Sequence, residues 1–207
     1  MNYPLAVSLI VLTSACQPAA PGQAATTEGY AREASAVAGN GASSAARITQ
    51  ENGVQSVCFE PEDDCIGIMT AQLDLAREEV LVMAFLFSNG RMVNALNRAA
   101  ARGVRVRMVV SDMREGHPRV RAVQQRGVEV MTRDNLTQHS KYLVIDRRLV
   151  ITGSQNFTFA SQSNSENTLV IDDPRTVAAY VRNWERRAAG SRPARDRPME
   201  QPQEAES

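Results

Sequence analysis

Two alternating patterns of apolar residues fill the middle of this chain and predict its secondary structure. Short apolar runs between polar turns are typical of strands, and the longest, residues 80–87, is expected to be covered on both faces. Between the runs, apolar residues recur every three or four positions, as in amphipathic helices. The expected strands are residues 54–59, 80–87, 104–110, 128–131, 142–145, 149–151 and 167–171.

Four helical stripes lie between or after these strands. Gly103 and Gly127 each follow a stripe, where glycine readily ends a helix, and Pro174 suits the first turn of the last helix. The alternation predicts an α/β fold with a mainly parallel central sheet flanked by helices, in one domain of residues 51–189. The stripes are Ile66, Met69, Leu73 and Ala76; Met92, Val93, Leu96 and Ala100; residues 119–125; and Val177, Tyr180, Val181 and Trp184.

Polar residues just before the stripes are expected to cap the helices. Ser88 can cap the helix of residues 92–100. The acidic pairs Asp63-Asp64 and Asp172-Asp173 stand at predicted helix starts, where the helix dipole favours carboxylates. For both pairs, helix capping is therefore a better interpretation than metal binding.

Both ends of the chain differ in composition from the middle. Residues 17–50 are small and polar with almost no large apolar side chains, and residues 190–207 are rich in proline and charge, so both are expected to be disordered. Residues 1–16 contain an apolar run, residues 5–12, that is too short to span a bilayer. Such a run is typical of a signal peptide and predicts export, although no lysine or arginine precedes it.

The end of this leader, residues 12–16 (LTSAC), resembles a bacterial lipobox, with Thr13 where leucine is usual. Two outcomes stay open. Lipidation of Cys16 would attach the protein to a bacterial membrane, whereas cleavage nearby without lipid would leave it in the periplasm.

The three cysteines of the chain also favour an oxidising compartment. If Cys16 is lipidated or removed, Cys58 and Cys65 remain as a pair that flanks a six-residue turn and could close a short disulfide loop. A zinc site is disfavoured, because two thiols and two widely spaced histidines do not make a ligand set.

The net charge of the 207 residues is zero, but the charge is unevenly distributed. Residues 81–135 hold ten arginines against four acids, whereas residues 51–80 hold one base against eight acids. The basic segment suits a polyanionic partner such as nucleic acid. Solvated helix faces explain the same arginines about equally well.

A candidate phosphodiester site lies in residues 138–158, QHSKYLVIDRRLVITGSQNFT. His139 and Lys141 are two apart, so in a strand both side chains leave the same face. An imidazole beside an ammonium suits a phosphate, because one can attack phosphorus while the other holds its oxygens. Ser154 and Asn156, at the end of the next strand, add neutral donors.

The other candidates near this segment have simpler explanations. His117, the second of two histidines, lies in a loop with no partner pattern around it. Phe157 and Phe159 could stack on bases, but at strand spacing after a buried run they are more often core residues.

The spacing His139, Lys141, Asp146, Gly153-Ser154 matches the HxKx₄Dx₆GS signature of the phospholipase D superfamily, which this chain resembles. Further stretches, including residues 58–61, 82–85, 153–158 and 183–184, are similar to the small single-motif bacterial endonucleases of the Nuc type. The resemblance implies an exported homodimer that cuts DNA with little sequence preference and needs no metal or other cofactor. It also implies that Glu166 orients the imidazole, and that Asp146 and Gly153 are mainly structural.

One copy of the motif leaves one imidazole for two tasks, attack on phosphorus and protonation of the leaving oxygen. A symmetric dimer would bring two His139 side chains together, one of them forming a phosphohistidine. The same chemistry permits a phospholipase that acts on phospholipid head groups, which a lipid anchor would suit. A noncatalytic nucleic-acid binder is a third alternative, disfavoured because binding alone does not require the imidazole.

Overall fold

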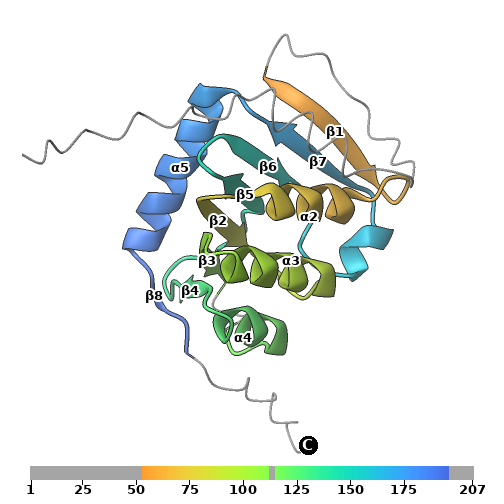
Figure 1. The fold of residues 1–207 in the computed structure, drawn as a ribbon. Helices are drawn as coiled ribbons and strands as arrows, with labels where there is room; N and C mark the ends of the chain where they lie inside the picture. The colour runs from red at the N-terminus through yellow and green to blue at the C-terminus, as the bar shows by residue number, and fades with distance from the viewer. Residues whose placement is uncertain (1–52, 112–114, 196–207) are drawn as a thin grey trace, which may run out of the picture.

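An eight-stranded mixed sheet runs through the part of the chain that the computed structural model describes, residues 53–111 and 115–195 (Figure 1). The leader, Cys16, the linker of residues 17–50 and the end of the tail lie outside these residues. The elements are β1 (Val54–Glu60), α2 (Cys65–Leu75), β2 (Glu79–Ala84), α3 (Gly90–Ala101), β3 (Arg105–Val110), α4 (Pro118–Gln124), β4 (Glu129–Thr132), β5 (Tyr142–Ile145), β6 (Leu149–Gly153), the 3-10 helix η2 (Ala160–Ser163), β7 (Glu166–Ile171), α5 (Pro174–Ala189) and β8 (Arg192–Pro193).

The strands are ordered β1-β7-β6-β5-β2-β3-β4-β8, and this order corrects one prediction. The α/β class and the flanking helices are as expected, but the sheet is not mainly parallel. Only β2–β3 and β3–β4 pair in parallel among the described strands, each through a helical crossover. β5 and β6 are joined by a tight turn, and β6 and β7 by residues 154–165, which contain a 3-10 helix but no α-helical crossover; both pairs are antiparallel.

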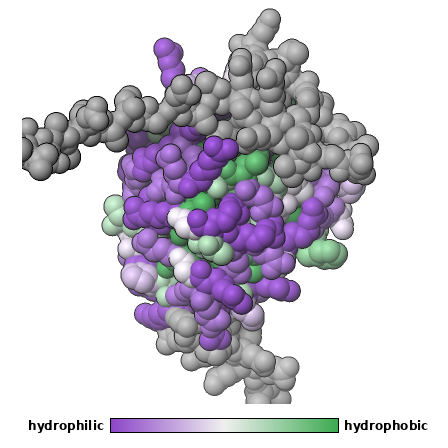
Figure 2. Space-filling model, in the orientation of Figure 1, coloured by the Kyte–Doolittle hydropathy of each residue, from purple (hydrophilic) through white to green (hydrophobic). Residues whose placement is uncertain are grey.

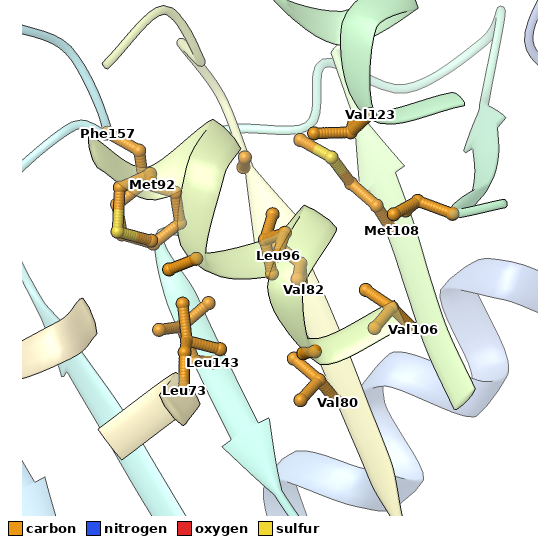
Figure 3. Packing of buried hydrophobic residues seen from close by; sticks show 14 of the residues in the cluster. Leu73, Val80, Val82, Met92, Leu96, Val106, Met108, Val123, Leu143 and Phe157 are labelled. Carbon is orange, nitrogen blue, oxygen red and sulfur yellow. The ribbon is translucent and has the colours of Figure 1, made fainter. Parts of the chain in front are cut away.

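Alternate residues of the central strand face two separate cores. Val80 and Val82 contact the larger core, which α2, α3 and α4 cover, and Figure 3 shows this packing around Leu96. Leu81 and Met83 face the smaller core, which α5 covers on the opposite side of the sheet. Burial on both faces explains why this strand reads as one continuous apolar run.

Helix caps agree with the polar residues of the sequence, with one correction. Asp64 accepts a hydrogen bond from the Gly67 amide and Asp173 from the Thr176 amide, as the capping interpretation predicted. The expected cap of α3, Ser88, is wrong: Asn89 caps this helix, because its side-chain oxygen accepts hydrogen bonds from two backbone amides. His117 caps α4 through Nδ1, 3.2 Å from the amide nitrogen of Arg119, which gives this histidine a structural role.

A disulfide joins Cys58 of β1 to Cys65 at the start of α2, as the sequence predicted. In the sequence between these cysteines, Glu60 has a buried side chain. It accepts hydrogen bonds from the Cys65 amide and from the side chain of Gln155. The disulfide therefore borders a network that reaches the residue next to Ser154.

The predicted disorder of residues 190–207 is wrong as far as residue 195. Arg192 and Pro193 form β8, the edge strand, which pairs with β4, and Ala194 is buried. Arg192 forms ion pairs with Glu115 and Asp134 that anchor this segment. The proline- and charge-rich composition of this segment did not predict a strand, because β8 is held in place by residues that are far away in the sequence.

The described surface that Figure 2 shows is largely hydrophilic, with a few apolar areas. Phe159, expected in the core with Phe157, is instead 78% exposed, whereas Phe157 is buried. Within residues 53–111 and 115–195, no helix is long and apolar enough to cross a membrane.

Candidate active site

The candidate catalytic residues lie together at one end of the central strands, where β2 and β6 end and β5 and β7 begin. We call this end of the strands the site edge of the sheet. Met83 near the end of β2 pairs with Tyr142 of β5, and Gly153 of β6 pairs with Thr168 of β7. His139 and Lys141 lie just before β5, outside the strand. The carboxyl ends of the parallel strands meet at this edge, which is the usual place for sites in open α/β sheets.

His139 and Lys141 are in direct contact. The Lys141 Nζ atom lies 3.0 Å from the His139 Nδ1 atom and 2.6 Å from the His139 carbonyl oxygen. A charged ammonium can only donate, so this contact places the ring's own proton on Nε2 when Lys141 is charged. The predicted pair is thus assembled within one chain.

An aromatic ring lies beneath this pair. The ring centroids of Phe85 and His139 are 4.4 Å apart, and the Lys141 Nζ atom is 5.2 Å from the centroid of Phe85. Partial burial lowers the pKa of Lys141, and the negative charge of Glu166 opposes that effect in part. His139 itself is exposed at the mouth of the site.

Ser154 and Glu166 form a second pair a short distance along the site edge. The Ser154 hydroxyl donates to a Glu166 carboxylate oxygen and accepts from the Asn167 amide at 3.0 Å. The other Glu166 oxygen accepts from Asn164 at 3.1 Å. Among the described residues, Glu166 therefore has no hydrogen bond to His139 of its own chain.

Gly153 lies where β6 approaches the backbone of β7 closely, whereas Asn156 lies outside the lining of the pocket that contains His139. A Cβ atom at Gly153 would collide with the backbone carbonyl of Asn167, so a side chain here would separate β6 from β7. Asn156 is partly buried, and its Oδ1 atom is buried without a hydrogen-bond partner. It does not line the pocket that contains His139, so its predicted phosphate contact stays a prediction.

Asp146 lies at the far end of β5, away from the imidazole. Its buried carboxylate accepts hydrogen bonds from the backbone amides of residues 77, 78 and 79, at the junction of α2 and β2. Asp146 and Arg147 both have positive φ angles in the three-residue turn, residues 146–148, that joins Ile145 to its partner Leu149. These contacts support the expected structural role of this motif residue.

A pocket of about 670 Å³ opens beside His139 and Lys141 and extends to α5. Tyr180 and Asn183 of α5 form one wall, and Tyr142 and Thr152 lie between this wall and Lys141. Sequence reasoning assigned none of these four residues to the site, because their apolar or neutral letters fitted the core pattern. In residues 53–111 and 115–195, no cluster of three or more His, Cys, Asp or Glu side chains could hold a metal ion.

Comparison with known proteins gives consistent matches over this region. The family model described as "Cardiolipin synthase, PLD-like domain" matches residues 69–188. A phospholipase D of Rickettsia conorii is 33% identical over 140 residues, 66% of this chain and 70% of the relative. A mitochondrial cardiolipin hydrolase of Xenopus laevis is 33% identical over 128 residues, 60% of this chain and 61% of the relative.

A solved structure matches as well. The crystal structure of Nuc, a phospholipase D family member from Salmonella typhimurium, aligns with a TM-score of 0.64 at 31% identity. The alignment covers 69% of this chain and 97% of Nuc. The residues matched by the family model include the whole stretch from His139 to Glu166.

Proposed function

This chain belongs to the phospholipase D superfamily of phosphodiester hydrolases, and we propose that it is an endonuclease that cleaves DNA without a metal ion. The observation that carries the proposal is the contact between His139 and Lys141 in an open pocket at the site edge of the sheet. The pocket offers a nucleophile and a fixed positive charge to a phosphodiester. The same two groups would perform the work that a metal ion performs in other phosphodiesterases.

The reaction would proceed in two displacements at phosphorus. In the first, the His139 Nε2 atom attacks, a P–N bond forms and the P–O bond to the leaving alcohol breaks, while a second imidazole gives that oxygen a proton. In the second, water attacks phosphorus, the P–N bond breaks, and the second imidazole takes the proton of the water. Lys141 would stabilise the charge of the five-coordinate phosphorus, and Ser154 would join it by turning toward the phosphate the one proton that it now donates to Glu166.

A second copy of the chain would supply what one chain lacks for this reaction. Attack by Nε2 requires that the ring proton move to Nδ1. The Lys141 Nζ atom, which now donates to Nδ1, would then turn to the phosphate, and a carboxylate would take its place as the partner of Nδ1. The described part of one chain provides no such carboxylate contact at His139, and its other histidine, His117, caps α4 and does not line the pocket. A twofold dimer would bring in both the carboxylate and a second imidazole, with Glu166 of one chain beside His139 of the other.

Nucleic acid is the proposed substrate because of the basic residues near the site. Arg186 and Arg187, at the end of α5, are close enough to Tyr142 to lower its pKa against the larger effect of burial. The motif resemblance to Nuc-type endonucleases supports the same substrate. DNA and RNA share the phosphodiester that these residues would bind.

The names of the curated relatives favour a second candidate. A phospholipase D and a mitochondrial cardiolipin hydrolase are both about one third identical to this chain. Hydrolysis of a phospholipid head group would use the same two displacements, with a lipid phosphodiester in place of a nucleic-acid strand. Attachment through Cys16 would bring the site to such a substrate.

One assay separates these candidates. Purified full-length protein is offered supercoiled plasmid DNA, single-stranded DNA, RNA and cardiolipin vesicles, each with EDTA, beside His139→Ala. We expect cleavage of DNA in EDTA that His139→Ala abolishes. Head-group release without DNA cleavage would replace the nuclease with the phospholipase, and DNA retention without turnover would indicate a binder.

We further propose that the protein is exported to the periplasm. The Cys58–Cys65 disulfide supports this location, because such bonds persist in oxidising compartments. Mass spectrometry of the mature N-terminus would separate lipidated Cys16 from cleavage without lipid.

A further inference from the structure

The pocket beside His139 is larger than a single phosphate group requires. Its volume of about 670 Å³ lies in the range, roughly 300–1,000 Å³, of pockets that bind whole small molecules. Part of its lining comes from α5, through Ala179, Tyr180 and Asn183. A group of the substrate that is bonded near the scissile phosphate could reach this part of the pocket.

The α5 wall of this pocket has a fixed aromatic ring. Tyr180 meets the ring of Tyr142 edge to face, with centroids 4.9 Å apart and planes at 81°. Its hydroxyl lies 3.4 Å from the Thr152 Oγ1 atom, so the ring is held by Tyr142 and at its own tip. A ring held in this way can offer to a flat partner a face that Tyr142 does not cover.

Beside this ring, Asn183 has a defined orientation. The Tyr142 hydroxyl donates to the Asn183 Oδ1 atom at 3.0 Å, and burial raises the pKa of Tyr142, so that phenol keeps its proton at neutral pH. The side-chain oxygen of Asn183 is thereby occupied, and its NH₂ group remains to donate into the pocket. An aromatic face next to an amide donor suits a nucleobase, which has a π face and carbonyl or ring-nitrogen acceptors.

From this arrangement we propose that the α5 wall is a base-binding subsite, in which Tyr180 stacks on the base adjacent to the scissile phosphate and Asn183 donates to its edge. The proposal rests on the nuclease function proposed above and narrows its substrate. A base lodged in a pocket cannot remain paired in a duplex, so the enzyme would act on single-stranded or locally unpaired nucleic acid.

The test compares two single-stranded DNA oligomers of equal length, one with thymine at every position and one with abasic residues throughout. The measured quantity is the ratio of kcat/KM for the thymine strand to kcat/KM for the abasic strand. We expect this ratio to exceed 1 in the wild type and to fall about tenfold in Tyr180→Leu, because stacking contributes on that order per base. Asn183→Ala should lower it by a smaller factor.

Two variants control for effects on folding. Tyr180→Phe keeps the aromatic ring, so its ratio of kcat/KM for the two strands should stay close to that of the wild type. Asn94→Ala, on the exposed face of α3 across the sheet, should leave it unchanged. An unchanged ratio in Tyr180→Leu, or a wild-type ratio of 1, would overturn the subsite while leaving the nuclease intact.

Failure of the nuclease proposal gives a different result. If neither strand is cleaved, fluorescence anisotropy with the same two labelled strands measures binding directly. Equal affinity for both strands would overturn the subsite as well. Tighter binding of the thymine strand that Tyr180→Leu abolishes would support the subsite in a protein that does not cut DNA.

Discussion

The ring of Phe85 lies 4.4 Å from the ring of His139 and tilts 41° against it. Phe85 follows β2 directly, so the sheet itself fixes the surface on which the imidazole rests. We predict that Phe85→Ala lowers kcat by roughly tenfold or more, because a loosened imidazole loses its alignment with phosphorus. Steady-state kinetics on plasmid or single-stranded DNA, with the melting temperature measured in parallel, would check this.

The matched control for that change is Phe59→Ala on β1, where the ring is 53% exposed. It removes the same atoms away from the imidazole and should leave kcat within a factor of about two. A wild-type kcat for Phe85→Ala at a temperature where the variant is fully folded would contradict the positioning role.

Lys141 should impose an alkaline limit on activity. Burial lowers its pKa, so it loses its proton at a lower pH than an ordinary lysine, whose pKa is about 10.4. We predict that kcat/KM, which reports the free enzyme, falls as pH rises through this lowered pKa. Lys141→Arg should lower activity at neutral pH but lose this decline, because a guanidinium stays charged. A decline that is identical in both proteins would assign it to another group.

Asp146 belongs to the signature motif, yet its contacts predict an effect on stability and not on chemistry. Asp146→Asn keeps a residue that tolerates the positive φ of the turn but removes the charge that three backbone amides share. We expect the free energy of unfolding in urea to drop by about 2 kcal/mol. The kcat per folded molecule should remain near that of the wild type, and a large loss of kcat would revise the structural role.

Local patterns predicted most of the strands and helices and the closeness of His139 to Lys141, because these depend on nearby residues. The run of residues 80–87 and the glycines at 103 and 127 have direct counterparts in β2 and in the ends of α3 and α4. The mistaken prediction of a mainly parallel sheet came from treating every strand as part of a crossover unit. The sequence does place a junction of two strands at residues 147–148, and the structure has a turn there, residues 146–148, but this turn contains no glycine and its antiparallel pairing was not predicted.

Features that depend on distant partners could not be read from the sequence. Phe85 was one letter of an apolar run, and only the fold places it under His139. Tyr180 fitted the buried stripe of α5, although its ring lines the pocket. Arg192 anchors β8 through Glu115 and Asp134, which lie 77 and 58 residues away along the chain.

The Cys58–Cys65 disulfide should stabilise the fold near the site. The cysteines are seven positions apart, and closure of so short a loop is worth about 2–3 kcal/mol in the chain-entropy model. We predict that the double variant Cys58→Ser/Cys65→Ser has a free energy of unfolding, measured in urea, that is lower by about this amount. A reductant should lower the free energy of unfolding of the oxidised wild type as well, but should leave that of the double variant unchanged. Equal stability of the two proteins would show that the disulfide contributes little.

The proposed need for two imidazoles predicts how mixed dimers behave. When wild type and His139→Ala are mixed and allowed to exchange subunits, only wild-type pairs contain both imidazoles. Activity should therefore follow the square of the wild-type fraction, so that an equal mixture retains roughly a quarter of the activity of undiluted wild type. Active monomers, or dimers whose chains work independently, would retain about half. Plasmid nicking rates across a series of mixtures at constant total protein, with mixtures made without exchange as the control, would distinguish these two curves.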